Sequence, residues 1–302
     1  MARNIDLMLT AVAPIIWGST YFITTEYFPA GYPLTVAMLR ALPVGLLLLL
    51  VVRQLPSGVW WFKILVLGAL NFSIFWWMLF ISAYRLPGGI AATVGAIQPL
   101  IVLFLARLLL GYPVRLLAIV SAMLGLGGIA VLVITPEASL DPLGIAAGIV
   151  GAISMAFGTV LARRWQPEVS LLTFTSWQLV AGGLLLLPVA MWFEPPLPAL
   201  TNENILGFIY LGLIGAGLTY VLWFRGLSRL EPASVSTLGF LSPITAVAIG
   251  WLFLEQGLSS MQFLAVITVF MSVWLSQFAS RPVISAKMTV ANSAKNVSVI
   301  NN

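Results

Sequence analysis

Two segments of this chain carry the same pattern of arginine, leucine, threonine, glycine and proline. Residues 85–99 read RLPGGIAATVGAIQP, and residues 229–243 read RLEPASVSTLGFLSP. Five positions are identical at a spacing of 144 residues, and Gly45 and Gly183, each followed by at least four leucines, match at a spacing of 138. The six-residue difference falls in the loop around residues 194–204. The chain is therefore built from two copies of one half-length unit.

Each copy contains five apolar stretches. Hydrophobic residues make up 61% of the chain and charged residues 8%, whereas a soluble domain carries roughly 25% charged residues. A helix that crosses a bilayer needs about 20 mostly apolar residues. We therefore predict an all-α membrane protein with ten transmembrane helices, at residues 7–25, 34–52, 64–84, 90–110, 116–134, 143–161, 171–193, 205–224, 234–254 and 262–278.

Positive charge collects on one side of the predicted membrane. With a cytoplasmic N-terminus, twelve of the fourteen Lys and Arg residues fall in cytoplasmic segments, while Arg85 falls outside and Arg40 lies within a span. Cytoplasmic segments carry the excess of Lys and Arg, so both termini are predicted to be cytoplasmic. Because each copy has an odd number of spans, the second copy enters the membrane upside down. This construction is an inverted repeat, which is common among secondary transporters.

The predicted organisation follows directly from these spans. A short cytoplasmic N-terminus at residues 1–6 precedes the first five-helix repeat, at residues 7–134. The second, inverted repeat occupies residues 143–278. Residues 279–302 are rich in Ser, Asn and Lys, so we expect a disordered cytoplasmic tail there.

Arg40 is the charged residue that lies well inside a predicted span. It is about 9 Å from the outer end of its helix at 1.5 Å per residue. From that depth an arginine side chain can reach the interface and serve only as an anchor. Alternatively, it lines a water-filled route and attracts an anionic group, since charge inside a membrane is by default a functional hypothesis. Its counterpart in the second copy is Gln178, which is also polar.

The fourth and ninth spans are interrupted at matching positions. Gly95 is followed four residues later by Pro99, and Gly239 in the same way by Pro243. A proline inside a helix removes one backbone hydrogen bond and kinks the helix. Such interruptions in both halves of a transporter point to its moving elements and its site. The four residues are hinge candidates, although a static kink made for packing is the other interpretation.

Several classes of function are disfavoured by what the sequence lacks. It has no His and no Cys, which removes the usual metal ligands and general bases, so no catalytic or metal site is expected. Every Asp and Glu lies in a terminus or loop, and no phosphate-binding loop for ATP is visible. The Lys and Arg residues lie singly between apolar spans, so nucleic acid is not an expected partner. We expect a monomeric protein that lies in a lipid bilayer, binds a small-molecule substrate and needs no cofactor.

The duplicated pattern resembles the drug/metabolite transporter superfamily. Trp17-Gly18-Ser19 in the first span, and the arginine-leucine to proline element in the fourth and ninth, are similar to its motifs. Each half resembles one EamA domain, and the whole is most similar to the YddG-type amino-acid exporters of the bacterial inner membrane. The resemblance covers residues 7–278. It implies a central cavity walled by spans from both halves.

The resemblance also implies which side chains line that cavity. They are aromatic, polar or flexible apolar residues on the inner spans, and Arg40 and Gln178 flank them. Trp17 lies near mid-membrane, facing either the cavity or a neighbouring helix. Trp76 and Trp77 point about 100° apart, so one of the two is expected to face the cavity. The substrate-binding candidates are Trp17, Tyr21, Arg40, Trp77, Gln98, Met155, Gln178, Tyr220 and Ser242.

These observations predict an inner-membrane exporter of aromatic and other neutral amino acids, or related metabolites, by alternating access. Aromatic walls would contact apolar groups, and Gln98, Ser242 and Arg40 would contact polar ones. Transport is facilitated or uses a coupling that the sequence does not identify. A drug or nucleotide-like metabolite exporter of the same fold is the alternative, and a membrane scaffold that moves nothing is a second. The sequence does not specify the substrate list or the resting conformation.

Overall fold

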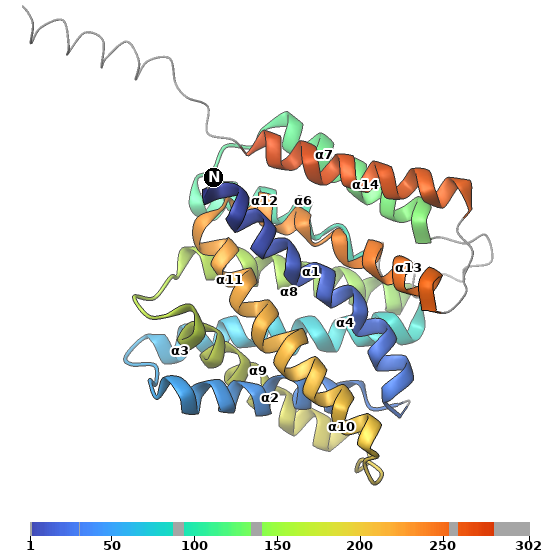
Figure 1. The fold of residues 1–302 in the computed structure, drawn as a ribbon. Coiled ribbons are helices and arrows are strands. Elements are labelled where there is room, and N and C mark those ends of the chain that lie inside the picture. The colour runs from blue at the N-terminus through green and yellow to red at the C-terminus, as the bar shows by residue number, and fades with distance from the viewer. Residues whose placement is uncertain (1, 30, 87–93, 134–140, 254–258, 281–302) are drawn as a thin grey trace, which may run out of the picture.

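The structure is a computed structural model that describes residues 2–29, 31–86, 94–133, 141–253 and 259–280. Within these ranges all regular elements are helices, and they pack into one bundle (Figure 1). Eight described helical runs are long and apolar enough to cross a membrane, and two shorter apolar helices, Gln98–Leu110 and Leu116–Leu132, accompany them. The start of the predicted fourth span and almost all of the predicted tail lie outside the described residues.

The elements follow the predicted spans in order. The third and eighth spans each consist of three consecutive helical elements, and the ninth consists of two. The bounds are α1 (Ala2–Tyr27), α2 (Pro33–Val52), α3 (Trp60–Gly68), η1 (Ala69–Ser73), α4 (Ile74–Arg85), α6 (Gln98–Leu110), α7 (Leu116–Val133), α8 (Pro142–Arg164), α9 (Leu171–Phe193), α10 (Asn202–Ile209), η2 (Tyr210–Leu218), α11 (Thr219–Arg229), α12 (Pro232–Leu238), α13 (Leu241–Phe253) and α14 (Ser260–Ala279).

The helix contacts pair one half of the chain with the other. Helix α2 packs against α9, and α7 lies beside α14 at one edge of the bundle (Figure 1). Helix α1 packs against α11 and α13, and in the same way α8 packs against α4 and α6. Exchanging each element with its counterpart in the other half leaves this set of contacts unchanged. The two copies therefore contribute equivalent surfaces to the bundle.

Two π-helical segments occupy matching places in the third and eighth spans. η1 spans Ala69–Ser73 and η2 spans Tyr210–Leu218. At the repeat spacing of 144 residues, η1 corresponds to residues 213–217, which lie inside η2. A π-helix replaces the usual hydrogen-bond ladder with longer i to i+5 bonds and is frequent at functional sites. Both π-helices lie against the α2–α9 pair, since η1 contacts α9 and η2 contacts α2.

The fourth and ninth spans are each interrupted within the segment that runs from the glycine to the proline, as the sequence predicted. In the ninth, α12 ends at Leu238 and α13 begins at Leu241. The amide of Phe240 donates to the Thr237 carbonyl at 3.2 Å, and that of Ile97 to the Val94 carbonyl at 3.3 Å. These i to i+3 bonds tighten the chain at places that differ by one residue at the repeat spacing of 144. The interruption places Gln98 at the start of α6 and Ser242 in the first turn of α13.

The largest buried apolar cluster lies where the two halves meet. It joins side chains from α1, α2, η1, α4, α8, α9 and α11, and it contains most of the buried aromatic rings. A second cluster joins α7, α12, α13 and α14. Large apolar side chains on the outside of the bundle remain exposed, among them Leu108, Met191 and Trp192. In a membrane-spanning bundle such surfaces face lipid.

Candidate functional site

Arg40 points into the bundle from α2. The residue is 8% exposed, and its Nη2 donates a hydrogen bond to the Gly215 carbonyl oxygen at 2.7 Å. Its guanidinium carbon lies 4.8 Å from the centre of the Trp76 ring, a distance at which a cation is attracted to the ring face. Arg40 therefore does not reach out to the membrane interface, which was one of the two interpretations from the sequence. Its side chain is directed into the bundle, as the other interpretation requires.

The π-helix supplies the carbonyl that holds Arg40. Gly215 lies inside η2, and its oxygen also accepts a hydrogen bond from Thr219 Oγ1 at 2.8 Å. Trp17 Nε1 donates to the same Thr219 hydroxyl at 2.9 Å. A continuous chain of hydrogen bonds thus joins α1, η2 and α2 across the boundary between the two halves. The sequence indicated Trp17 and Arg40 separately, but nothing in it indicated this link.

Five aromatic rings surround this chain of hydrogen bonds, and we call them the aromatic cage. The Trp17 ring centre lies 5.1 Å from that of Tyr220 and 5.0 Å from that of Trp223. Phe72 lies 4.5 Å from Tyr220 and 5.2 Å from Trp76. Trp223 is 1% exposed, and its Nε1 has no hydrogen-bond partner among the described residues. Three spans supply the rings: α1 and the η1–α4 span from the first copy, and α11 from the second.

Trp76, not Trp77, is the tryptophan that meets Arg40. Trp77 instead lies against Phe193, with ring centres 6.1 Å apart. It lines a groove of about 500 Å³ between α2, α4 and α9, at the end of the bundle that carries Arg85 and Glu194. The family resemblance had indicated Trp77, and not Trp76, as a substrate-binding residue. The neighbours point in different directions, and sequence alone did not show which direction is inward.

Gln178 forms the second half of a symmetric arrangement. It is fully buried on α9, and its Oε1 accepts a hydrogen bond from Asn71 Nδ2, in η1, at 2.9 Å. Gln178 is the repeat counterpart of Arg40, and Asn71 is the counterpart of Gly215. In each copy, a polar residue of the second span therefore contacts the π-helix of the other copy. For Gln178 this partner is a protein side chain, which favours a structural role.

Replacing Gln178 by leucine is expected to destabilise the folded protein by about 1–3 kcal/mol, because the buried Asn71 amide loses its acceptor. Replacing both partners by leucine should recover part of the loss, since neither polar group then remains buried without a partner. Thermal unfolding in detergent would measure both effects. A double variant less stable than the sum of the two single changes would contradict the pairing.

The remaining predicted residues lie around the cage or outside the described part of the chain. Met155 is 5% exposed on α8 and belongs to the same apolar cluster as the cage. Gln98 is partly buried, and its Nε2 has no hydrogen-bond partner among the residues that the structure describes. The backbone amide of Ser242 donates to the Gly239 carbonyl at 3.1 Å. The side chain of Tyr21 lies outside the described residues.

Charged side chains cluster at the two ends of the bundle. At the end that carries the N-terminus, Asp6 pairs with Arg225 at 2.9 Å and with Arg229 at 3.3 Å. At the opposite end, Arg85 pairs with Asp141 at 3.2 Å. The pKa of the Asp141 carboxyl is lowered, chiefly by the hydrogen bond that it accepts from the Gly144 amide and also by Arg85. Sequence reasoning gave no functional role to these residues.

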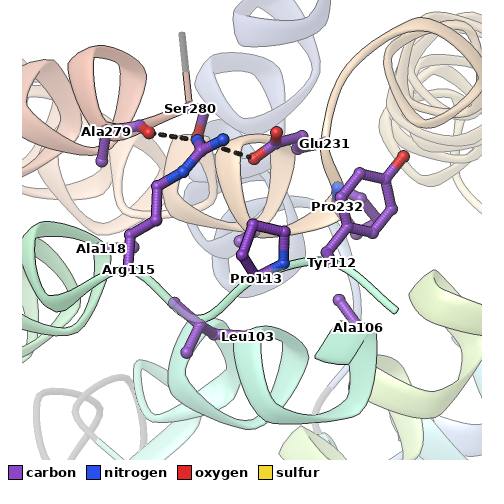
Figure 2. Close-up of a pocket in the computed structure, with 11 residues that line it drawn as sticks. Leu103, Ala106, Tyr112, Pro113, Arg115, Ala118, Glu231, Pro232, Ala279 and Ser280 are labelled. Atoms are coloured by element: carbon purple, nitrogen blue, oxygen red, sulfur yellow. Dashed lines mark hydrogen bonds and ion pairs between the residues drawn. The ribbon is translucent and has the colours of Figure 1, made fainter. Parts of the chain in front are cut away.

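A small pocket of about 20 Å³ lies near the Asp6 end of the bundle (Figure 2). The Arg115 guanidinium, at the pocket wall, is directed at the Ala279 carbonyl oxygen and at the Glu231 carboxylate. Arg115 Nη1 lies 3.6 Å from Glu231 Oε2. Burial raises the pKa of Glu231 above its ordinary value of 4.5, while Arg115 and Arg3 act in the opposite direction. The pocket joins the start of α12 to the ends of α6, α7 and α14.

This raised pKa predicts a pH dependence of stability. Between pH 4.5 and the raised pKa of Glu231, the folded protein holds a proton that the unfolded chain releases, so stability falls as pH increases across this window. Replacing Glu231 by glutamine should flatten that fall. Melting temperatures between pH 4 and pH 8 would measure it, with Glu168→Gln, at an exposed position, as the control. Equal slopes in the native chain and the Glu231 variant would contradict the prediction.

Comparisons with known proteins agree with this architecture. The sequence profile of the EamA-like transporter family matches residues 4–134 and again residues 142–278. "Protein PecM" of Dickeya dadantii is 46% identical over 267 residues, which cover 88% of this chain and 90% of that protein. The "Uncharacterized inner membrane transporter YedA" of Escherichia coli K12 is 30% identical over 290 residues, covering 92% and 94% of the two chains.

A more distant relative and a solved structure extend the comparison. The "WAT1-related protein At3g02690, chloroplastic" of Arabidopsis thaliana is 27% identical over 279 residues, covering 87% of this chain and 67% of that protein. A crystal structure with 19% identity superposes with a TM-score of 0.78 over 93% of this chain and 99% of the other. At that identity the structural likeness concerns the fold alone.

Proposed function

The chain belongs to the EamA-like transporter family, and we propose that it exports aromatic and other neutral amino acids, or closely related metabolites, by alternating access. It is a multi-pass membrane transporter of the drug/metabolite superfamily. The finer proposal concerns its cargo and the residues that bind it. Cargo with one anionic group and an apolar body fits the chemistry of the central residues.

The observation that carries this proposal is the position of Arg40 within the aromatic cage. One guanidinium, buried against the Trp76 ring, supplies one positive charge. Around it, the rings of Trp17, Tyr220 and Trp223 supply apolar surface together with polar edges. A carboxylate can replace the Gly215 carbonyl as the acceptor of Arg40 and form a stronger, charge-assisted hydrogen bond. An aromatic or aliphatic side chain can then pack against the rings.

The exchange symmetry of the helix contacts supports an inverted repeat of ten transmembrane helices. The proposed halves are residues 7–134 and 143–278, around a central cavity, with a cytoplasmic N-terminus at 1–6 and tail at 279–302. The distribution of Lys and Arg supports two cytoplasmic termini. The Escherichia coli relative is named an inner membrane transporter, which supports the same location for this chain.

The interruptions of the fourth and ninth spans support a role for Gly95, Pro99, Gly239 and Pro243 as hinges. The freed backbone lies beside Gln98 and Ser242, so that movement at the hinges would reach the cargo. Replacing Pro99 or Pro243 by alanine restores a backbone donor and should slow the exchange between the two accessible states. Unchanged exchange in both variants would contradict the hinge proposal.

Counterflow in proteoliposomes tests the function directly. Vesicles preloaded with unlabelled amino acids should take up labelled Phe, Thr and Met transiently above the equilibrium level. Empty vesicles should reach only that level, and vesicles without the protein should take up little label. Uptake that does not change with a pH gradient would indicate facilitated transport. Folded protein that moves none of the three would contradict amino-acid export and favour the alternative, export of drugs or nucleotide-like metabolites, which a wider set of solutes would test.

A further inference from the structure

Two ion pairs at opposite ends of the bundle occupy related places in the two copies. At one end, Asp6 of α1 binds Arg229, the last residue of α11. At the other end, Arg85, the last residue of α4, binds Asp141, the residue before α8. Arg85 and Arg229 are counterparts at the repeat spacing of 144 residues. Each pair therefore joins the first helix of one copy to the third span of the other.

The same helices touch again one to two turns deeper, below each ion pair. A Cβ added at Gly226 of α11 would overlap Thr10 of α1, and one added at Gly148 of α8 would lie 2.9 Å from Ser82 Oγ of α4. Thr10 is fully buried and Ser82 is 1% exposed. Each ion pair is thus the outermost contact of a tightly packed helix pair, and separating that pair would open the bundle at its own end.

The two ion pairs differ in strength. Asp6 lies 9% exposed and pairs with two arginines, since Arg225 Nη2 is 2.9 Å from its carboxylate. Arg85 and Asp141 are 47% and 33% exposed. An exposed ion pair contributes little because water screens it, whereas removing one partner of a buried pair leaves a charge without compensation. The Asp6 end is therefore held more firmly.

We propose that these ion pairs are the two latches of the transport cycle, one closing each end of the central site. The inference rests on the proposed function for its direction: Asp6 with Arg225 and Arg229 closes the cytoplasmic end, and Arg85 with Asp141 closes the outer end. Both pairs are formed in the structure, which on this proposal is closed at both ends. Breaking one pair shifts the population towards opening at that end, because a state that is open there lacks the interaction.

The chain contains no cysteine, so single reporters can be introduced without removing others. Thr10→Cys reports on the cytoplasmic end and Ser82→Cys on the outer end, through the rate of labelling by a membrane-impermeant maleimide in oriented vesicles. Asp6→Asn should raise labelling at position 10 by at least about tenfold. Asp141→Asn should raise labelling at position 82 by about threefold. Asparagine can still cap α8 at position 141, so the helix end is retained.

Controls separate a latch from a general loosening of the fold. Glu168→Gln and Glu203→Gln remove exposed carboxylates and should change neither rate. Arg229→Gln leaves the Asp6–Arg225 pair in place and should raise labelling less than Asp6→Asn does. Arg85→Gln should match Asp141→Asn, and the two changes together should add nothing further.

The outcomes distinguish the latch from the transport proposal, because labelling does not require a known substrate. Unchanged labelling in Asp6→Asn, Asp141→Asn and Arg85→Gln would overturn the latches even if amino acids are transported. Equal increases at both reporters in any one variant would also overturn them, since a latch acts at one end. Selective labelling changes without amino-acid counterflow would leave the latches standing and overturn the proposed cargo.

Discussion

Replacing Arg40 by glutamine is expected to raise the amino-acid concentration for half-maximal counterflow by about 10- to 150-fold, because a hydrogen bond to a charged group contributes about 1.5–3 kcal/mol. Glutamine keeps a donor for the Gly215 carbonyl but has no charge to meet a carboxylate. Lysine should restore only part of the affinity, since it lacks the planar fork of donors and the flat face that lies over Trp76.

Two comparisons make this prediction specific to a carboxylate. An aromatic amine that lacks the carboxylate should compete poorly with labelled Phe in the native protein, and the Arg40 variant should discriminate much less between the two. Arg107→Gln, at an exposed position, should leave transport unchanged. A lower maximal rate with unchanged half-maximal concentration and unchanged discrimination would mean that Arg40 only holds η2 and α2 together, and that its role in binding is wrong.

Most of the features that could be predicted from the sequence came from the apolar stretches and from the repeat. Apolar length indicated the spans, and matching residues at fixed spacings indicated the polar pair Arg40 and Gln178 and the interruptions near Pro99 and Pro243. The structure confirms an all-helical fold in the described residues and the interruption of the ninth span at Gly239. These features are local, since apolar length and proline chemistry act within one helix. Ten spans and the inverted orientation remain predictions.

The π-helices and the aromatic cage could not be predicted in the same way. A π-helix adds one residue to a turn and rotates the residues that follow, so counting at 100° per residue fails beyond it. Trp76 follows η1 by three residues, and Trp223 follows η2 by five. The count from the sequence did not decide between Trp76 and Trp77, and Trp77 was predicted from the family resemblance. Asp6 was missed for another reason, because its partners lie more than 200 residues away.

A close backbone approach between the two copies lies at a matched pair of glycines in α2 and α9. A Cβ at Gly183 would lie 2.7 Å from the Leu42 Cβ and 2.8 Å from its backbone nitrogen. A Cβ at Gly45 would lie 2.8 Å from the Val180 nitrogen and 2.9 Å from the Leu179 Cβ. Backbone atoms cannot move aside as the end of a flexible side chain can. The sequence indicated both glycines as repeat counterparts, but not that each faces the other helix.

Alanine at Gly45 or Gly183 is therefore expected to destabilise the protein by about 1–3 kcal/mol, because each forces α2 and α9 apart. The two changes together should cost less than the sum, since the first already separates the two helices. Gly127 of α7 is the control, since a Cβ there meets nothing within 4 Å. Alanine at Gly127 should stabilise its helix by up to about 1 kcal/mol. Thermal unfolding of the purified variants in detergent measures all three. If alanine at Gly183 is as harmless as alanine at Gly127, then α2 and α9 do not pack this closely, and Arg40 and Gln178 are not held against the π-helices.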